Sequence, residues 1–258
     1  EVGGLMDDEA IVQFLRFFRR KSQEMKWDGL DAMYEDQFDD LERWLDQPTP
    51  EAKGKLELDP DLEIPDYFFR GYHHQPGGFS GHALSGLMYD MGLDVSFPGL
   101  PSGGVAESVD DKPYERILDL GCGSGRSTEP YKRRFPNSEV WGLEPSAQLL
   151  KVAQKRAGAR GLEINYLQAI AAETRFPDDH FDLVSATILF HEVTAPAMKV
   201  ALKEARRILA PGGQLVIGDE LPFELMNDYE LWYDRWQTVN NNEPYWAEIK
   251  SQSIEALC

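Results

Sequence analysis

The sequence contains few cysteines, an excess of acidic over basic residues, and no long apolar run. Only two of its 258 residues are cysteines, Cys122 and Cys258. Neither has a partner at a spacing typical of a structural disulfide, which indicates a reducing compartment. No run approaches the roughly 18–20 apolar residues that span a bilayer, and no basic-then-apolar signal segment is present. The sequence therefore predicts a cytoplasmic protein with no membrane partner.

The charge balance excludes further partners. The chain has 45 acidic and 26 basic residues, a formal net charge of −19. A field of this sign repels phosphate backbones and anionic lipids, so we expect no nucleic-acid partner. The length suits one α/β domain with a helical appendage.

The N-terminal part, residues 1–112, predicts helices, a linker and a lid or loop region. Apolar residues at helical spacing predict a helix over 7–26 and a second over 34–45. Prolines among charged residues over 47–66 predict an extended linker. Glycines and prolines over 92–113 predict a long loop. These helices carry no chemical motif, and we interpret them as a packing appendage or lid.

The central part, residues 113–220, alternates strand and helix patterns. Five strands are predicted, at 116–120, 139–143, 164–168, 181–186 and 214–218, and helices are expected after the first, second and fourth of them. This alternation predicts a doubly wound, mostly parallel sheet of the Rossmann-like kind, with ligands at the carboxyl ends of its strands. Residues 221–258 predict two helices and no pair of closing strands, so we expect this segment to be truncated.

A glycine-rich turn follows the first predicted strand. Glycines at 121, 123 and 125 allow a ligand to lie on the backbone and tolerate positive φ. The helix expected from Arg126 directs its N-terminal amides to the same place. A nicotinamide-binding turn needs a third glycine where Arg126 stands, which disfavours an oxidoreductase. Glu144 ends the second strand, where an acid accepts hydrogen bonds from the ribose hydroxyls of nucleotide-type ligands.

Taken together, the motifs over 114–220 resemble those of class I S-adenosylmethionine-dependent methyltransferases. The resemblance is carried by Ile-Leu-Asp-Leu-Gly-Cys-Gly-Ser-Gly, Trp-Gly-Leu-Glu-Pro-Ser, Arg-Phe-Pro-Asp-Asp-His-Phe-Asp-Leu-Val and Arg-Ile-Leu-Ala-Pro-Gly-Gly-Gln-Leu-Val-Ile, in this order. It implies the methyltransferase variant of the Rossmann-like fold, S-adenosylmethionine as cofactor, and transfer of a methyl group by in-line displacement.

The resemblance also implies roles for individual residues. The backbone of Gly121 and Gly123 would pass under the methionine part and the sugar of the cofactor. Asp119 would orient the methionine ammonium, directly or through water. Glu144 would bind the ribose, and Pro145 would pack against the adenine.

The adenine-reading loop of the family corresponds to residues 168–171 here. The family usually has an acid where this chain has Ile170. Adenine recognition would then depend on the backbone of Ala171 with apolar packing, or on Glu173. Cys122, inside the glycine turn, completes the predicted cofactor-binding set.

The substrate side carries the candidate catalytic residues. His191 follows the fourth strand, where the family faces its substrate, and a histidine can accept a proton near neutral pH. The polar and aromatic segment 70–79 predicts either the mouth of a binding site or a loop facing water. Its Tyr72, His73 and His74 could supply a base or only close the mouth.

The sequence thus predicts an enzyme that methylates a small molecule and needs no metal. A non-catalytic S-adenosylmethionine-binding sensor or partner subunit is the alternative. The acceptor atom, whether oxygen, nitrogen, sulfur or carbon, is left open, because the sheet fixes the cofactor and the lids fix the substrate.

Overall fold

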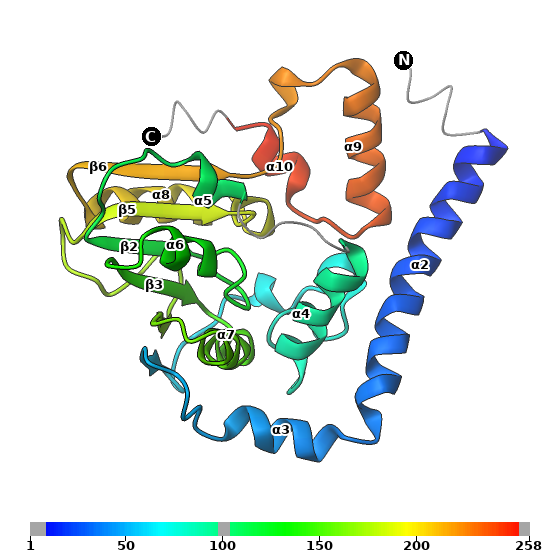
Figure 1. Cartoon of the computed structure of the whole chain (residues 1–258). Helices are drawn as coiled ribbons and strands as arrows, with labels where there is room; N and C mark the ends of the chain where they lie inside the picture. The colour runs from blue at the N-terminus through cyan, green and yellow to red at the C-terminus, as the bar shows by residue number, and fades with distance from the viewer. Residues whose placement is uncertain (1–8, 98–103, 253–258) are drawn as a thin grey trace.

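The computed structural model describes residues 9–97 and 104–252 (Figure 1). Its centre is a six-stranded sheet in the order β1-β4-β3-β2-β5-β6, in which all neighbouring strands are parallel. The strands are β1 (Leu56–Glu57), β2 (Arg116–Leu120), β3 (Glu139–Glu144), β4 (Asn165–Gln168), β5 (Phe181–Thr187) and β6 (Leu209–Gly218). The predicted doubly wound α/β fold is confirmed.

Helices cover both faces of this sheet and continue beyond it. They are α2 (Ala10–Glu35), α3 (Phe38–Asp46), α4 (Ser85–Ser96), α5 (Gly104–Ser108), α6 (Glu129–Arg134), α7 (Ala147–Ala159), α8 (Ala195–Ile208), α9 (Asp228–Asn240) and α10 (Trp246–Lys250). Short 3-10 turns are η1 (Asp66–Phe69), η2 (Tyr72–His74), η3 (Phe190–Glu192) and η4 (Phe223–Leu225). No helix in the described ranges is long and apolar enough to cross a membrane.

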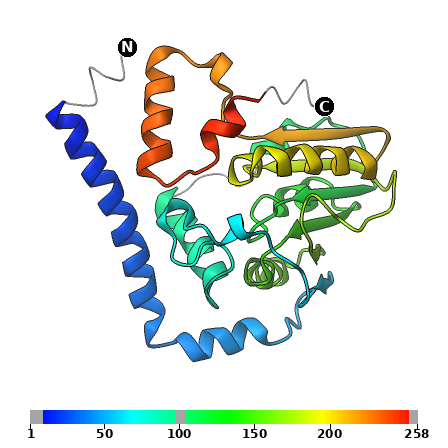
Figure 2. The ribbon, with the colours of Figure 1, turned by 180° about the vertical axis from the view of Figure 1, so that it is seen from behind.

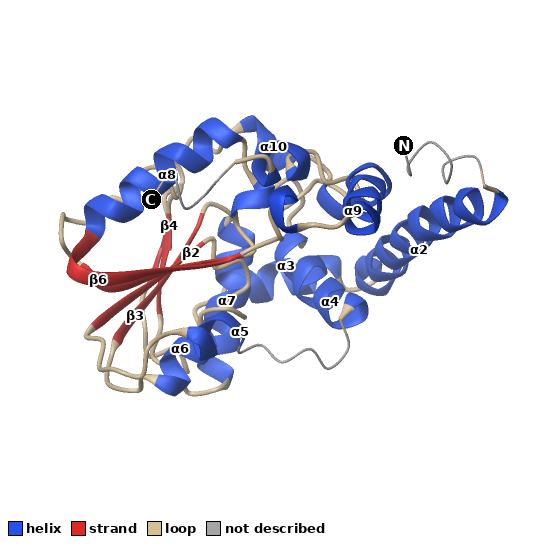
Figure 3. Cartoon of the chain, turned by 90° about the horizontal axis from the view of Figure 1, so that it is seen from above, coloured by secondary structure: helices blue, strands red, loops and turns tan. Residues whose placement is uncertain are grey.

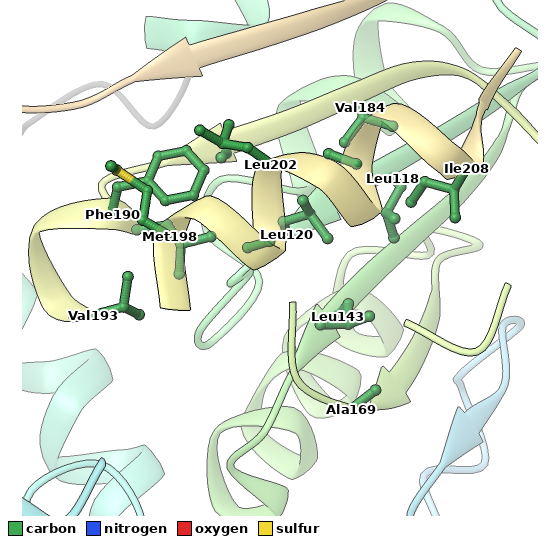
Figure 4. Close-up of a cluster of buried hydrophobic side chains, with 14 of the residues drawn as sticks. Leu118, Leu120, Leu143, Ala169, Val184, Phe190, Val193, Met198, Leu202 and Ile208 are labelled. Atoms are coloured by element: carbon green, nitrogen blue, oxygen red, sulfur yellow. The ribbon is translucent and has the colours of Figure 1, made fainter. Parts of the chain in front are cut away.

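Alternation along the strands divides the core into two layers. Ile117 of β2 packs in the layer covered by α6 and α7, where Tyr131 and Leu150 are buried. Leu118, the next residue, points to the opposite face and packs in the layer that contains Met198 of α8 (Figure 4). Figure 3 shows α8 on one side of the sheet and α6 and α7 on the other. Successive side chains of a strand point to opposite faces, so apolar runs here indicate strands buried on both sides.

The topology fixes where a ligand binds. Strand β2 pairs with β3 on one side and with β5 on the other, so the strand order reverses beside β2. In open parallel sheets, ligands bind at the carboxyl ends of the strands at this reversal. The loops after β2, β3 and β5 meet there.

The first helix is longer than predicted, and most apolar side chains of its first half are exposed, whereas Trp27 and Leu30 further along are buried. It runs over Ala10–Glu35 rather than 7–26, of which residues 7 and 8 lie outside the described ranges. Tyr34, predicted in the second helix, belongs to this one. The predicted apolar positions Ile11, Phe14, Leu15 and Phe18 are all exposed. Figures 1 and 2 show α2 on the side of the molecule away from the sheet, with α9 beside it.

One prediction for the N-terminal part is wrong, and the predicted linker over 47–66 is irregular up to the start of η1 except for the two residues of β1. The loop predicted over 92–113 contains the end of α4 and all of α5, while 98–103 lie outside the described residues. Gly92, which contributed to the prediction of a loop, lies inside α4. The absence of a side chain at this position makes room for Trp27 of α2. A Cβ atom there would lie 2.8 Å from the Trp27 ring of α2. The predicted linker over 47–66 adds a strand, β1, to the sheet edge. The proposed division at 112 and 220 stays a prediction.

Candidate active site

The glycine-rich turn leaves β2 in the conformation that its glycines permit. Gly121, Gly123 and Gly125 have φ of +68°, +52° and +80°, a region that residues with a Cβ rarely adopt. The Cys122 amide donates to the Leu143 carbonyl at 3.0 Å, which fixes the turn to β3. The backbone at this turn therefore has a conformation that allows a ligand to approach it closely.

Glu144 lies at the end of β3 against the same turn. Its carboxylate accepts hydrogen bonds from the Gly123 amide at 3.3 Å and the Ser146 amide at 3.0 Å. Burial raises the pKa of Glu144 to about 7, against the opposing effect of these two bonds. A buried carboxylate with lone pairs to spare suits a ligand that presents hydroxyl donors.

Asp119 lies at the carboxyl end of β2, buried among three hydroxyl groups. Its carboxylate is fully buried and accepts from the hydroxyls of Ser127 at 2.6 Å, Thr128 at 2.7 Å and Ser185 at 2.9 Å. Burial raises the pKa of Asp119, and the three hydroxyls oppose this rise. The geometry fits a carboxylate that links the glycine turn to the following helix and to β5. The predicted contact with a methionine ammonium, directly or through water, stays a prediction.

Cys122 contributes only its backbone to the turn. The side chain is buried in the layer under α6 and α7, with Sγ 2.8 Å from where a Cβ of Gly142 would lie. Burial raises the pKa of the thiol well above its ordinary value. A reactive cysteine needs exposure and a stabilised thiolate, and Cys122 has neither.

An apolar pocket opens beside the turn and joins three predicted residues. Gly121, Pro145 and Ala171 line it, while Glu173 is exposed and does not. The remaining lining residues are apolar or aromatic, among them Tyr67, Phe68, Leu143, Ile170, Leu189 and Phe190. The cavity measures about 30 Å³, which is room for two or three water molecules at roughly 10–15 Å³ each.

Leu189 and Tyr89 cover the glycine turn. Leu189 Cδ1 lies 2.6 Å from the place of a Cβ on Gly121, and the Tyr89 ring lies 3.4 Å from that place on Gly123. Tyr89 is carried by α4, and Leu189 precedes η3. Neither was predicted from the sequence, although leucine and methionine at helical spacing over 84–91 would have indicated the helix.

An ion-pair network holds α4 over the turn. Asp90 accepts from the Ser124 hydroxyl at 2.7 Å, from Arg126 at 2.7 Å and from Arg156 at 3.0 Å. Arg126 also binds both carboxylate oxygens of Asp94. Arg126, which stands where a nicotinamide-binding turn has its third glycine, therefore links α4 to the core.

Backbone strain marks the segment before Leu189. Ile188 has φ of +54° although it is β-branched, and its side chain is exposed. For such a residue the left-handed region is an outlier that costs of order 1–3 kcal/mol. The Ile188 amide donates to the Gly218 carbonyl at 2.7 Å, which holds the strained position. Strain of this kind clusters at ligand-binding segments.

The predicted base, His191, is buried between two carboxylates. Nδ1 lies 2.6 Å from Asp219 and Nε2 lies 3.4 Å from Glu192. Burial lowers the pKa of His191, but the hydrogen bonds to Asp219 and Glu192 outweigh this and raise the pKa to about 10. An imidazolium with both nitrogens engaged cannot accept a proton from a substrate.

Tyr72 and His73 lie close to His191 but differ in their surroundings. The Tyr72 hydroxyl lies within hydrogen-bond distance of two carbonyls, that of Tyr67 at 2.7 Å and that of Glu192 at 2.9 Å, which share its one proton, and burial raises the pKa of Tyr72. His73 is partly exposed and contacts two glutamates, Glu192 at 3.3 Å and Glu243 at 2.7 Å. The segment 70–79 is thus folded against the core and the C-terminal part rather than facing water.

The fold and the turn define a class, an α/β domain with a glycine-rich turn and a buried carboxylate at the carboxyl ends of β2 and β3. Residues 117–213 match the family model described as "Methyltransferase domain". The core is therefore similar to a methyltransferase domain, in agreement with the resemblance that its motifs carry.

Curated relatives carry consistent names. A demethylmenaquinone methyltransferase of Thermus thermophilus is 42% identical over 107 residues, covering 42% of this chain and 48% of the relative. A ubiquinone/menaquinone biosynthesis C-methyltransferase of Burkholderia multivorans is 29% identical over 133 residues, covering 50% and 54%. This chain thus spans about half the length of the curated relatives that it matches.

Among solved structures, a putative methyltransferase of Bacillus halodurans is 25% identical, with a TM-score of 0.47. The similarity covers 54% of this chain and 59% of that one.

Proposed function

We propose that this chain transfers the methyl group of S-adenosylmethionine to a small molecule. The proposal is carried by one observation: the Glu144 carboxylate, the left-handed turn at Gly121 and Gly123, and an apolar pocket meet at one edge of the sheet. This is the combination that a ribose, a methionine chain and an adenine require. No feature of the described residues favours the sensor alternative.

The residues divide the task between binding and positioning. Glu144 accepts from the ribose hydroxyls, Pro145 and Ala171 flank the adenine, and Gly121 and Gly123 give the ligand access to the backbone. Asp119 acts as a positioning residue through its three hydroxyl partners. Methyl transfer from a sulfonium needs alignment above all, and alignment of two reactants can contribute about 7–11 kcal/mol.

His191 takes a positioning role in this proposal instead of the predicted role of general base. Asp219, its partner, also accepts from the Phe190 amide at 2.7 Å. The pair therefore holds η3 and, next to it, Leu189 over the turn. Tyr72 likewise fixes η3 through the Glu192 carbonyl.

The acceptor class in this proposal comes from the names of the relatives, because the apolar pocket beside the turn is assigned to the adenine. Relatives named as a demethylmenaquinone methyltransferase and a 2-phytyl-1,4-naphtoquinone methyltransferase make naphthoquinones the first acceptors to test. A cytoplasmic location and the absence of nucleic-acid and membrane partners stay predictions from composition.

Calorimetric titration tests the cofactor. We expect S-adenosylhomocysteine to bind with one site and micromolar affinity, and NAD not to bind, because Arg126 stands where a nicotinamide-binding turn has its third glycine. Binding of NAD alone, or of neither ligand to a folded chain, would contradict the proposal.

The affinity for S-adenosylhomocysteine should depend on pH through Glu144. The ionised carboxylate accepts from both ribose hydroxyls, and the pKa of about 7 means that a proton must leave on binding below that pH. We expect Kd to rise toward tenfold for each pH unit below about 7. The free protein should show the opposite trend in stability. Because the pKa of Glu144 is raised on folding, its contribution falls as pH rises from about 4.5 to 7. A Glu144→Gln variant should lose the slope in Kd, and a slope that persists in it would assign the effect to another group.

A further inference from the structure

A second cluster of charged side chains lies next to the proposed cofactor site. His73 of η2, Glu192 of η3 and Glu243, which follows α9, come from three distant parts of the chain. Their candidate ligand atoms all lie within 4.8 Å of one another. Asp219 and His191 extend the cluster toward the sheet.

Two carboxylate oxygens in this cluster have no partner. Glu243 is fully buried, and its Oε1 accepts from Asn241 at 2.6 Å and lies 2.7 Å from His73, but its Oε2 has no hydrogen bond. Oε2 of Glu192 is buried and also has no hydrogen bond. Buried carboxylate oxygens are normally satisfied, because desolvation of an unpaired one is costly.

The charges of the cluster do not cancel. Glu192, Glu243 and Asp219 together carry three negative charges. The two histidines supply at most two positive charges, even when both are protonated.

We propose that His73, Glu192 and Glu243 bind one first-row divalent cation such as Zn²⁺ or Mn²⁺. An imidazole with two carboxylates is a donor set of these ions, whereas Mg²⁺ and Ca²⁺ prefer oxygen ligands alone. Ligand atoms at about 2.0–2.2 Å from one ion lie about 3–4 Å apart, so small side-chain rotations bring the present spacing into range. Three protein ligands leave at least one coordination position for water or an acceptor oxygen.

Neighbouring contacts support the site from outside. The Trp27 indole of α2 donates to the His73 carbonyl at 2.6 Å, and Gln23 donates to Asn241 at 2.9 Å. His73 keeps about a third of its side chain exposed, which gives an ion a path to the buried glutamates. A cation here would link the N-terminal helix, the core and the C-terminal segment, so we expect its binding to raise the melting temperature as well.

The inference is independent of the proposed function, and calorimetry on the whole chain tests it. We expect Zn²⁺ or Mn²⁺ to bind with one site, and to bind at least tenfold more weakly to Glu243→Gln. Glu248→Gln removes the same charge from an exposed position of α10 and should bind like the wild type. His73→Asn, a residue that tolerates the left-handed φ of +50° at this position, should weaken binding like Glu243→Gln.

Three results would overturn the proposal. The first is that neither Zn²⁺ nor Mn²⁺ binds to the wild type. The second is that all variants bind the ion equally, as they would if it bound to the acidic surface without a specific site. The third is that the site prefers Mg²⁺ or Ca²⁺. Thermal melts without metal establish that each variant is folded. A parallel titration of each variant with S-adenosylhomocysteine tests the two proposals separately. A variant that loses only the metal site should still bind S-adenosylhomocysteine.

Discussion

Gly121→Ala should reduce the affinity for S-adenosylhomocysteine by at least a hundredfold. The added methyl group would lie 2.6 Å from Leu189 Cδ1, on the side of the turn where the ligand is proposed to pass. Leu189 is flexible and can retreat, but it then moves into the pocket that the adenine needs. The φ of +68° adds a backbone cost of about 1–2 kcal/mol. Calorimetric titration of the purified variant measures the loss.

Gly161→Ala is the matched control for that experiment. Gly161 has nearly the same φ, +66°, and a Cβ there meets nothing within 4 Å. Both variants should therefore lose a similar amount of stability in thermal melts, while only Gly121→Ala loses the ligand. If the two variants bind alike, the turn at Gly121 is not the ligand cradle.

The parts of the fold that the sequence predicts are those in which local pattern and tertiary environment agree. Strands buried on both faces appear as short apolar runs, and Ile117 and Leu118 do pack in opposite layers. Gly92 shows the opposite case. Its type suggests a loop, but the reason for a glycine there is the Trp27 ring of a helix far away in the chain. No local pattern carries that information.

The same distinction applies to the site. The glycine turn and Glu144 were predicted because one short segment and one spacing specify them. The two side chains that cover the turn, Tyr89 and Leu189, could not be predicted in this way, because they come from separate elements and belong to no motif. The role of His191 could not be predicted either. Its partner Asp219 lies at the end of another strand, and it is this contact, with Glu192, that turns an ordinary histidine into a buried cation.

Removal of the Glu144 carboxylate should have the other large effect. Hydrogen bonds to a charged acceptor contribute about 1.5–3 kcal/mol each, so Glu144→Ala should weaken S-adenosylhomocysteine binding by about a hundredfold or more. The variant also leaves the amides of Gly123 and Ser146 without their acceptor, which loosens the turn itself.

Glu139→Ala provides the comparison for Glu144→Ala, because Glu139 begins the same strand and is exposed at its opposite end. It loses a carboxylate of the same kind from β3, and we expect its Kd to stay within about twofold of the wild type, as for a surface substitution away from the site. The difference in Kd between the two variants then measures what a carboxylate contributes at the carboxyl end of β3, compared with one at the start of the same strand. Equal affinities would mean that the ribose lies elsewhere, and the reversal of strand order beside β2 would then mark a ligand of another kind.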